Sequence, residues 1–335
     1  MPLFLDILRS ETAASPERRQ AALTGLAAYQ AAARAPRPEG APVVARAGAA
    51  ALRDYGGAGV PVMFVPSLIN PPFILDLAPE RSLLRWLRAR GVRVLLVDWG
   101  TPAPGADDID HHVAAQLVPL IAALDRPPVL VGYCLGGTMA AAAACLAPVA
   151  GLATLATPWH FSRFGDVARG RIAALWAAAQ APCRQLGLVP MEVLQTGFWQ
   201  LDPARTIAKY EQFGTLPPNS AAARDFVALE DWANAGAPLS FGAGRQLFED
   251  FYAADRPGRG AWTIGGRAIA PQALTCPTLD IVSTTDRIVP AASAAGLGAQ
   301  LAVEAGHVGM VVGRRARETL WQPLADWLNQ IIRAR

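Results

Sequence analysis

A cysteine flanked by glycines follows a short apolar run in the first half of the chain. The residues are Gly132-Tyr133-Cys134-Leu135-Gly136, with Val129-Leu130-Val131 before them and an alanine-rich stretch after them. An apolar strand, a Gly-x-Cys-x-Gly turn and a helix form the nucleophile-elbow pattern, with cysteine in place of serine. Because this turn is tight, side chains at Gly132 or Gly136 are expected to collide with neighbouring elements. The helix N-terminus beside Cys134 favours the thiolate.

Two later residues have the types that a cysteine nucleophile needs, a general base and a carboxylate that orients it. Asp286 comes just after an apolar run at residues 278–282, and His307 lies between glycines after a shorter run at 301–303. The order nucleophile, acid, histidine is the order of this elbow's fold. We therefore predict a triad in which His307 activates Cys134 and Asp286 orients the imidazole. Each residue taken alone has a simpler interpretation. Cys134 could be a buried cysteine in a glycine-rich turn, and Asp286 could be a turn or helix-cap residue, with a similar alternative for His307.

An acyl-transfer site also needs hydrogen-bond donors for the oxyanion that forms on the substrate carbonyl. We predict the backbone N–H of Leu135, directly after the nucleophile, as one donor. The second is expected in the loop at residues 67–70, from Ile69 or its neighbour. An ordinary connection between a strand and a loop is the alternative for this segment.

The remaining cysteines and histidines are expected to have structural roles or to be solvated. We expect Cys145, Cys183 and Cys276 to pack as small apolar side chains, His111 and His112 to be solvated at a helix start, and His160 to be structural. The cysteines form no Cys-x-x-Cys pair, so neither a zinc site nor a disulfide framework is expected, and their spacing fits a reducing compartment.

The elements that position these residues alternate between apolar runs and helical patterns. Strands are expected at 62–66, 92–98, 128–132, 149–156, 278–282 and 301–303, and helices at 16–36, 81–90, 110–124, 136–146, 290–297 and 317–332. Fully apolar strands separated by helices indicate a mostly parallel sheet covered on both faces. The fold class is therefore α/β, and the elbow makes it an α/β-hydrolase fold.

The alternation stops between residues 158 and 260, where aromatic residues and helical patterns prevail. We predict an N-terminal helical segment and linker over residues 1–45, a first part of the core over 46–157, an inserted helical cap over 158–265 and a second part of the core over 266–335. The linker is expected at the Pro-rich stretch 35–42.

Composition sets limits on the class of protein. The chain has 335 residues, of which 52% are hydrophobic and 17% charged, with a net charge of +3. This supports a large core, excludes extensive disorder and gives no basic cluster that would indicate nucleic-acid binding. The apolar stretch at 139–156 is better explained by a buried helix and strand than by a transmembrane segment. The N-terminus lacks a signal-peptide pattern, so a cytoplasmic location is expected.

A cysteine nucleophile changes the energetics of acyl transfer. Moving an acyl group from a coenzyme A thioester to cysteine exchanges one thioester for another, so the acyl-enzyme stays activated for transfer to a hydroxyl. This favours an acyltransferase over a plain esterase, although cysteine hydrolases on this fold exist.

With these motifs in place, the chain resembles the polyhydroxyalkanoate (PHA) synthases, most closely the short catalytic subunit of the class III type. The resemblance covers about residues 15–332. Its pieces are Val65-Pro66-Ser67-Leu68-Ile69-Asn70, Asp98-Trp99-Gly100, Gly132-Tyr133-Cys134-Leu135-Gly136-Gly137-Thr138, Lys209-Tyr210, Asp250-Phe251-Tyr252, Ile264-Gly265-Gly266-Arg267, Asp286-Arg287-Ile288-Val289-Pro290 and Gly306-His307-Val308-Gly309. The elbow and the Gly-His-x-Gly piece are the most specific.

The resemblance implies a defined chemistry. Cys134 would take an (R)-3-hydroxyacyl group from coenzyme A, His307 would act as base, and Asp286 would assist it. Polyester, such as polyhydroxybutyrate, would grow at a granule surface. The family also implies a homodimer, a class III accessory subunit and no cofactor besides the coenzyme A thioester substrate.

The chain departs from the family pattern in two places. Arg287 follows Asp286 where many members have histidine, and the segment from Asp286 to His307 is short for this branch. An intracellular PHA depolymerase or an acyl-CoA thioesterase, with water as acceptor, is therefore a competing interpretation. A non-catalytic protein at the granule surface is a third, which the complete triad disfavours.

Overall fold

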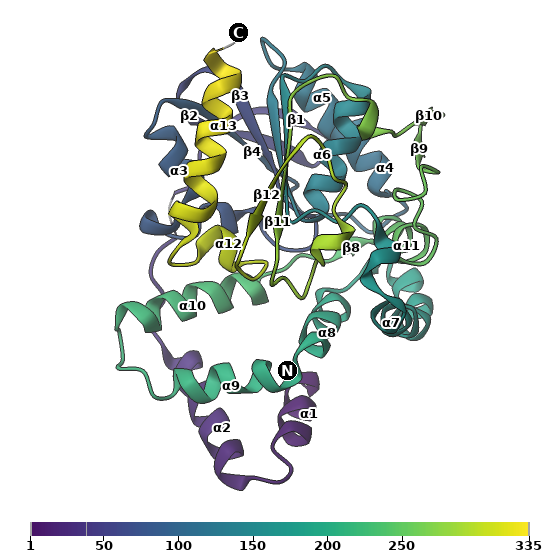
Figure 1. Cartoon of the computed structure of the whole chain (residues 1–335). Helices are drawn as coiled ribbons and strands as arrows, with labels where there is room; N and C mark the ends of the chain where they lie inside the picture. The colour runs from purple at the N-terminus through teal and green to yellow at the C-terminus, as the bar shows by residue number, and fades with distance from the viewer. Residues whose placement is uncertain (1, 38, 334–335) are drawn as a thin grey trace.

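The computed structural model describes residues 2–37 and 39–333, and an eight-stranded sheet forms its centre (Figure 1). The strand order is β1-β2-β4-β3-β5-β6-β11-β12. The strands are β1 (Val43–Ala47), β2 (Ala50–Gly56), β3 (Ala58–Val65), β4 (Val92–Asp98), β5 (Val129–Tyr133), β6 (Gly151–Leu155), β11 (Thr278–Ser283) and β12 (Ala299–Val303). From β4 to β12 the pairing is parallel, and β1 and β2 are antiparallel. The predicted mostly parallel α/β sheet is confirmed.

Helices cover both faces of the sheet, which explains why its strands are apolar throughout. In β3, Val62 and Phe64 pack with the helices α3 (Leu83–Arg88) and α13 (Gln322–Arg333). Met63, one position along, packs on the opposite face. Because successive strand side chains point to opposite faces, each strand needs apolar residues at every position.

The second face is covered by the helix after the elbow and by the segment before β5. These elements are α6 (Leu135–Leu146), α4 (Ile109–His111), the π-helical turn η3 (His112–Leu117) and α5 (Val118–Ala122). The helices predicted at 110–124 and 136–146 are thereby confirmed. The expectation of solvated histidines at 111 and 112 is wrong for His112, which is 8% exposed and packs edge-on against Trp99.

The prediction of a helix at 290–297 is also wrong, since only a single 3-10 turn, η7 (Ala291–Ser293), forms there. The N–H of Gly296 is donated to the buried carboxylate of Asp280 at 2.8 Å. The carbonyl of Ser293 accepts the N–H groups of Trp159 and His160 at 2.7 and 2.8 Å. The backbone groups that a helix needs are therefore bound to other parts of the fold.

Helices prevail between β6 and β11, as expected for an inserted helical region. They are α7 (Asp166–Leu186), α8 (Met191–Leu201), α9 (Pro203–Phe213), α10 (Ala221–Asn234), α11 (Phe241–Arg245) and the π-helical η5 (Gln246–Ala253). Two short strand pairs, β7 (Leu188–Val189) with β8 (Leu239–Ser240) and β9 (Thr263–Ile264) with β10 (Arg267–Ala268), also lie in this region. No helix in the described residues combines the length and apolar character needed to cross a membrane.

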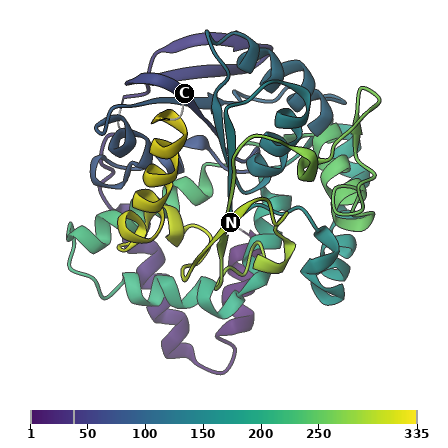
Figure 2. The same cartoon turned by 45° about the horizontal axis from the view of Figure 1, so that its top comes forward.

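The N-terminal helices pack on this helical region, away from the sheet. Figure 1 and Figure 2 show α1 (Pro2–Glu11) and α2 (Pro16–Ala31), in purple, beside α9. Gly25 lies so close to α9 that a Cβ there would meet the Tyr210 carbonyl oxygen at 1.8 Å. The helix predicted at 16–36 is confirmed over residues 16–31 and ends there, because Ala32 is extended. Helix α1 lies within the predicted N-terminal helical segment, whereas the β1–β2 pair was not predicted.

Candidate active site

Cys134 occupies a strained turn between β5 and α6. Its backbone angles are φ 56° and ψ −131°, a conformation that residues other than glycine rarely adopt. A Cβ at Gly132 would meet the Gly137 Cα at 2.3 Å, and one at Gly136 would meet the Val65 carbonyl oxygen at 2.2 Å. The predicted steric need for glycine at 132 and 136 is confirmed. The conformation is that of a nucleophile elbow.

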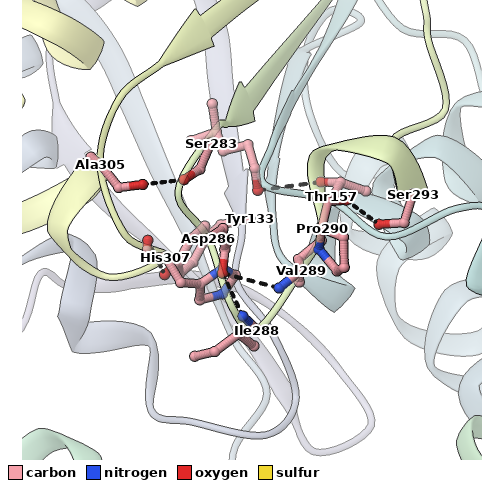
Figure 3. Close-up of polar contacts among 11 residues, drawn as sticks. Tyr133, Thr157, Ser283, Asp286, Ile288, Val289, Pro290, Ser293, Ala305 and His307 are labelled. Atoms are coloured by element: carbon pink, nitrogen blue, oxygen red, sulfur yellow. Dashed lines mark hydrogen bonds and ion pairs between the residues drawn. The ribbon is translucent and has the colours of Figure 1, made fainter. Parts of the chain in front are cut away.

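Asp286 and His307 reach Cys134 from the carboxyl ends of β11 and β12. These strands are parallel to each other and to β6, which pairs with β5, so their carboxyl ends share one edge of the sheet. The Nδ1 atom of His307 lies 2.5 Å from Oδ2 of Asp286 (Figure 3). Cys134 lines the same cavity as these two residues, and its sulfur is close enough to the imidazole to raise the pKa of His307. The structure thus brings together the three residues that the sequence analysis selected.

The Asp286 carboxylate is fully buried and held by its own loop. Its Oδ1 accepts the backbone N–H groups of Ile288 at 2.7 Å and Val289 at 3.0 Å. With Oδ1 fixed in this way, Oδ2 faces His307 (Figure 3). The Ser283 hydroxyl also donates to the Ala305 carbonyl, which ties the loop of Asp286 to the loop of His307.

The electrostatics of His307 depend on its two partners. Burial lowers the pKa of His307, but the Cys134 sulfur and the Asp286 carboxylate act in the opposite direction and raise it to about 10, from an ordinary value of 6.5. Opposite charges and hydrogen bonds to the charged form stabilise an imidazolium even when it is buried. The two partners together therefore favour the protonated form of the His307 imidazole.

Tyr133, the residue before the cysteine, supports His307 in two ways. Its hydroxyl donates to the His307 carbonyl at 3.1 Å, and its ring stacks on the imidazole with centroids 5.1 Å apart (Figure 3). No role for Tyr133 was predicted from the sequence. Its place inside the elbow motif was the available signal, since a side chain there starts at the end of β5.

The two predicted oxyanion donors differ in their surroundings. Leu135 is the first residue of α6, where an N–H has no acceptor within the helix. The N–H of Ile69 is already donated to the Ser67 hydroxyl at 3.1 Å. A role for Ile69 as oxyanion donor therefore requires that this bond be released.

The other cysteines lie away from the triad loops. Cys183 is 2% exposed, and burial raises its pKa. Burial also raises the pKa of Cys145, which lies in α6. A raised pKa favours the neutral thiol, which is the poorer nucleophile. Arg287, at the position where the family often has histidine, forms an ion pair with Asp202 at the start of α9.

Two cavities open at Cys134. The larger, about 490 Å³, is lined by Asp286, His307 and several polar residues of the helical region. The smaller, about 190 Å³, extends toward α7. Within the described residues, no group of three or more His, Cys, Asp or Glu side chains is placed to hold a metal ion.

The sheet covered by helices, the elbow at Cys134 and the placement of Asp286 and His307 at strand ends are features of one large enzyme family. The chain belongs to the alpha/beta hydrolase family, whose model matches residues 62–319. A monoacylglycerol lipase from Paleococcus ferrophilus shares the fold, with a TM-score of 0.52, 16% identity and coverage of 84% of this chain and 98% of the lipase.

More specifically, the chain is homologous to poly(3-hydroxyalkanoate) polymerase subunits. The PhaC subunit of Haloferax mediterranei is 29% identical, with 81% of this chain and 59% of that protein covered. The PhaC subunit of Thiocystis violacea is 27% identical, with 81% of each chain covered. The chain thus spans about three fifths of the haloarchaeal relative. The resemblance to the PHA synthases is confirmed.

Proposed function

We propose that this protein is an acyltransferase of the PHA polymerase type, which forms a thioester on Cys134 and transfers the acyl group to a hydroxyl. The observation that carries the proposal is the contact of His307 with both Cys134 and Asp286 at the end of a strained elbow. Homology to PhaC subunits adds the substrate class, (R)-3-hydroxyacyl-CoA, and polymer as the product.

In the first step the Cys134 thiolate attacks the thioester carbonyl of the acyl-CoA. A Cys134–acyl bond forms, the bond from the carbonyl to the coenzyme A sulfur breaks, and the departing thiolate takes the proton of the His307 imidazolium. The N–H of Leu135 is proposed to stabilise the oxyanion. One thioester replaces another, so the acyl group stays activated.

In the second step His307 changes from acid to base. Acylation removes the charge on the Cys134 sulfur, which is one of the two groups that raise the pKa of His307. Burial then lowers that pKa, so the neutral imidazole can take a proton from the acceptor hydroxyl. The alkoxide attacks the Cys134 thioester, an ester forms, and the thiolate returns to pair with the reprotonated imidazole.

The group that accepts the acyl chain from Cys134 determines whether the enzyme is a polymerase or a hydrolase. If water attacks the Cys134 thioester, the same residues make a thioesterase, and if the substrate is polyester they make a depolymerase. Acceptor choice depends on how well the helical region excludes water. From the resemblance to the PHA synthases, we also propose that the protein works as a homodimer, at a granule surface and with a helical accessory subunit.

The test is to incubate the purified protein with (R)-3-hydroxybutyryl-CoA and (R)-3-hydroxyoctanoyl-CoA, with and without a candidate accessory subunit. Free coenzyme A is followed, and the products and the Cys134 peptide are analysed by mass spectrometry. Release of coenzyme A with oligomers on Cys134 is the expected result. Release with only free hydroxy acid would make the protein a thioesterase, and no release would reject acyl-CoA as the donor.

A further inference from the structure

The two cavities that meet at Cys134 differ in the number of charged side chains that line them. Cys134, Ile69 and Ile288 line both. The larger cavity also contains the charged side chains of Lys209 and Glu230, whose Nζ and Oε atoms lie 2.8 Å apart. A group held on the Cys134 sulfur therefore borders a cavity with several charged side chains on one side. On the other side lies the smaller cavity, whose charged lining residues are Arg171 and Arg287.

Two helices contribute apolar side chains to the wall of the smaller cavity. Helix α7 contributes Ala168, Ile172 and Leu175. Helix α8 contributes Leu194, Phe198 and Leu201 in the same way. Each set has the spacing i, i+4, i+7, which places its members on one face of a helix. The two helices thus turn one apolar face each toward this cavity.

Packed aromatic rings complete the wall. Phe161 is fully buried and lies 5.1 Å from the ring of Tyr252 and 5.3 Å from that of Phe251. Phe248 stacks on Trp176 with ring centroids 4.7 Å apart. Rings that pack on several neighbours resist displacement, so this part of the cavity has a defined shape.

We propose that the smaller cavity is an acyl arm, which holds the hydrocarbon chain of the acyl group carried by Cys134. The inference rests on the proposed function and adds a substrate preference to it. An apolar chain beyond the fourth carbon leaves water when it enters the arm, and each buried methylene favours binding by roughly fourfold. The structure therefore assigns a preference for medium-length acyl chains over four-carbon ones.

Ala168 provides a selective test because it is the smallest side chain on the α7 part of the wall. Ala168→Phe places a ring in the arm. Val167→Phe is the matched control, because Val167 is the next residue on the same helix, is 73% exposed and does not line the cavity. Both variants add a ring to one turn of α7, so a general effect on this helix would appear in both.

Acylation of Cys134 is measured by peptide mass spectrometry with four-carbon and eight-carbon (R)-3-hydroxyacyl-CoA. We expect the wild type to be acylated at least tenfold faster by the eight-carbon donor. Ala168→Phe should lose this preference and keep the four-carbon rate within twofold, and Val167→Phe should behave as wild type. Equal rates for both donors in the wild type, or equal slowing of both by Ala168→Phe, would overturn the proposal. If Ala168→Phe left the rate of the first acylation unchanged but shortened the polymer, the proposal would also be overturned. The smaller cavity would then be a path for the product.

A second probe does not depend on acyl transfer and separates the two proposals. Butyl and octyl methanethiosulfonates react with a thiolate. A disulfide forms between the Cys134 sulfur and the alkylthio group, the bond to the sulfonyl sulfur breaks, and methanesulfinate leaves. Faster labelling of Cys134 by the octyl reagent, lost in Ala168→Phe, supports the arm even if every acyl-CoA is inert. Equal labelling by both reagents would reject the arm without affecting the proposed acyltransferase.

Discussion

Asp286 and His307 face each other across 2.5 Å, from carboxylate Oδ2 to imidazole Nδ1, although 21 positions separate them in the chain. They meet because β11 and β12 are adjacent parallel strands whose carboxyl ends lie side by side. The short segment between them is therefore sufficient to bring the acid and the histidine together.

Replacing the nucleophile should abolish acyl transfer. We expect Cys134→Ser to lower coenzyme A release on the order of 10³-fold or more, because a serine hydroxyl ionises far less readily than a thiol and is the weaker nucleophile. Cys145→Ser is the matched control, since Cys145 lies in the next helix and outside both cavities. Full activity in Cys134→Ser would show that another group carries the acyl chain.

Asp286→Asn should impair catalysis and leave the fold intact. The asparagine Oδ1 can still accept the N–H groups of Ile288 and Val289, but the side chain no longer offers a carboxylate to His307. We expect kcat to fall by ~10²–10⁴-fold with little change in KM, by comparison with other triads. Steady-state kinetics and thermal unfolding check this. A large loss of stability would point to a structural role instead.

The protonation of His307 should depend on Cys134. Its pKa of about 10 exceeds the ordinary value of 6.5, so between these pH values the folded protein holds a proton that the unfolded chain releases. The contribution of His307 to the stability of the folded protein is fully present below pH 6.5 and is lost as the pH rises through about 10. We expect Cys134→Ala to lower the pKa of His307, because burial remains and the sulfur is gone. Titration of the imidazole by NMR measures this, and an unchanged pKa would contradict the proposed change from acid to base.

Gly137, the second residue after Leu135 in α6, should tolerate no side chain. A Cβ there would meet the Thr157 hydroxyl oxygen at 1.8 Å, so Gly137→Ala should destabilise the protein by about 1–3 kcal/mol or more. Gly170→Ala in α7 is the control, because a Cβ there meets nothing within 4 Å and should stabilise by about 0.5–1 kcal/mol. Urea unfolding of both variants decides the matter, and equal stability would contradict the close packing of α6 on Thr157.

The segments that differ from the sequence-based predictions have a common physical cause. The 290–297 segment has helical composition, but its backbone groups bind Asp280 and Trp159, which are distant in the sequence. His112 has the pattern of a solvated helix start, yet tertiary packing places it against Trp99. Local patterns carry no information about such partners, so tertiary contacts override them.

By itself, the sequence determined the strands of the parallel sheet and the identity of the three residues at its carboxyl edge. It could do so because buried strands must be apolar at every position and an elbow must contain glycine where backbone approaches backbone. Only the tertiary structure decided that Tyr133 stacks on His307, that the Ile69 N–H is bound to Ser67, and that α7 and α8 enclose a second cavity beside Cys134. These features depend on distances between residues far apart in the chain, which packing of the whole fold fixes.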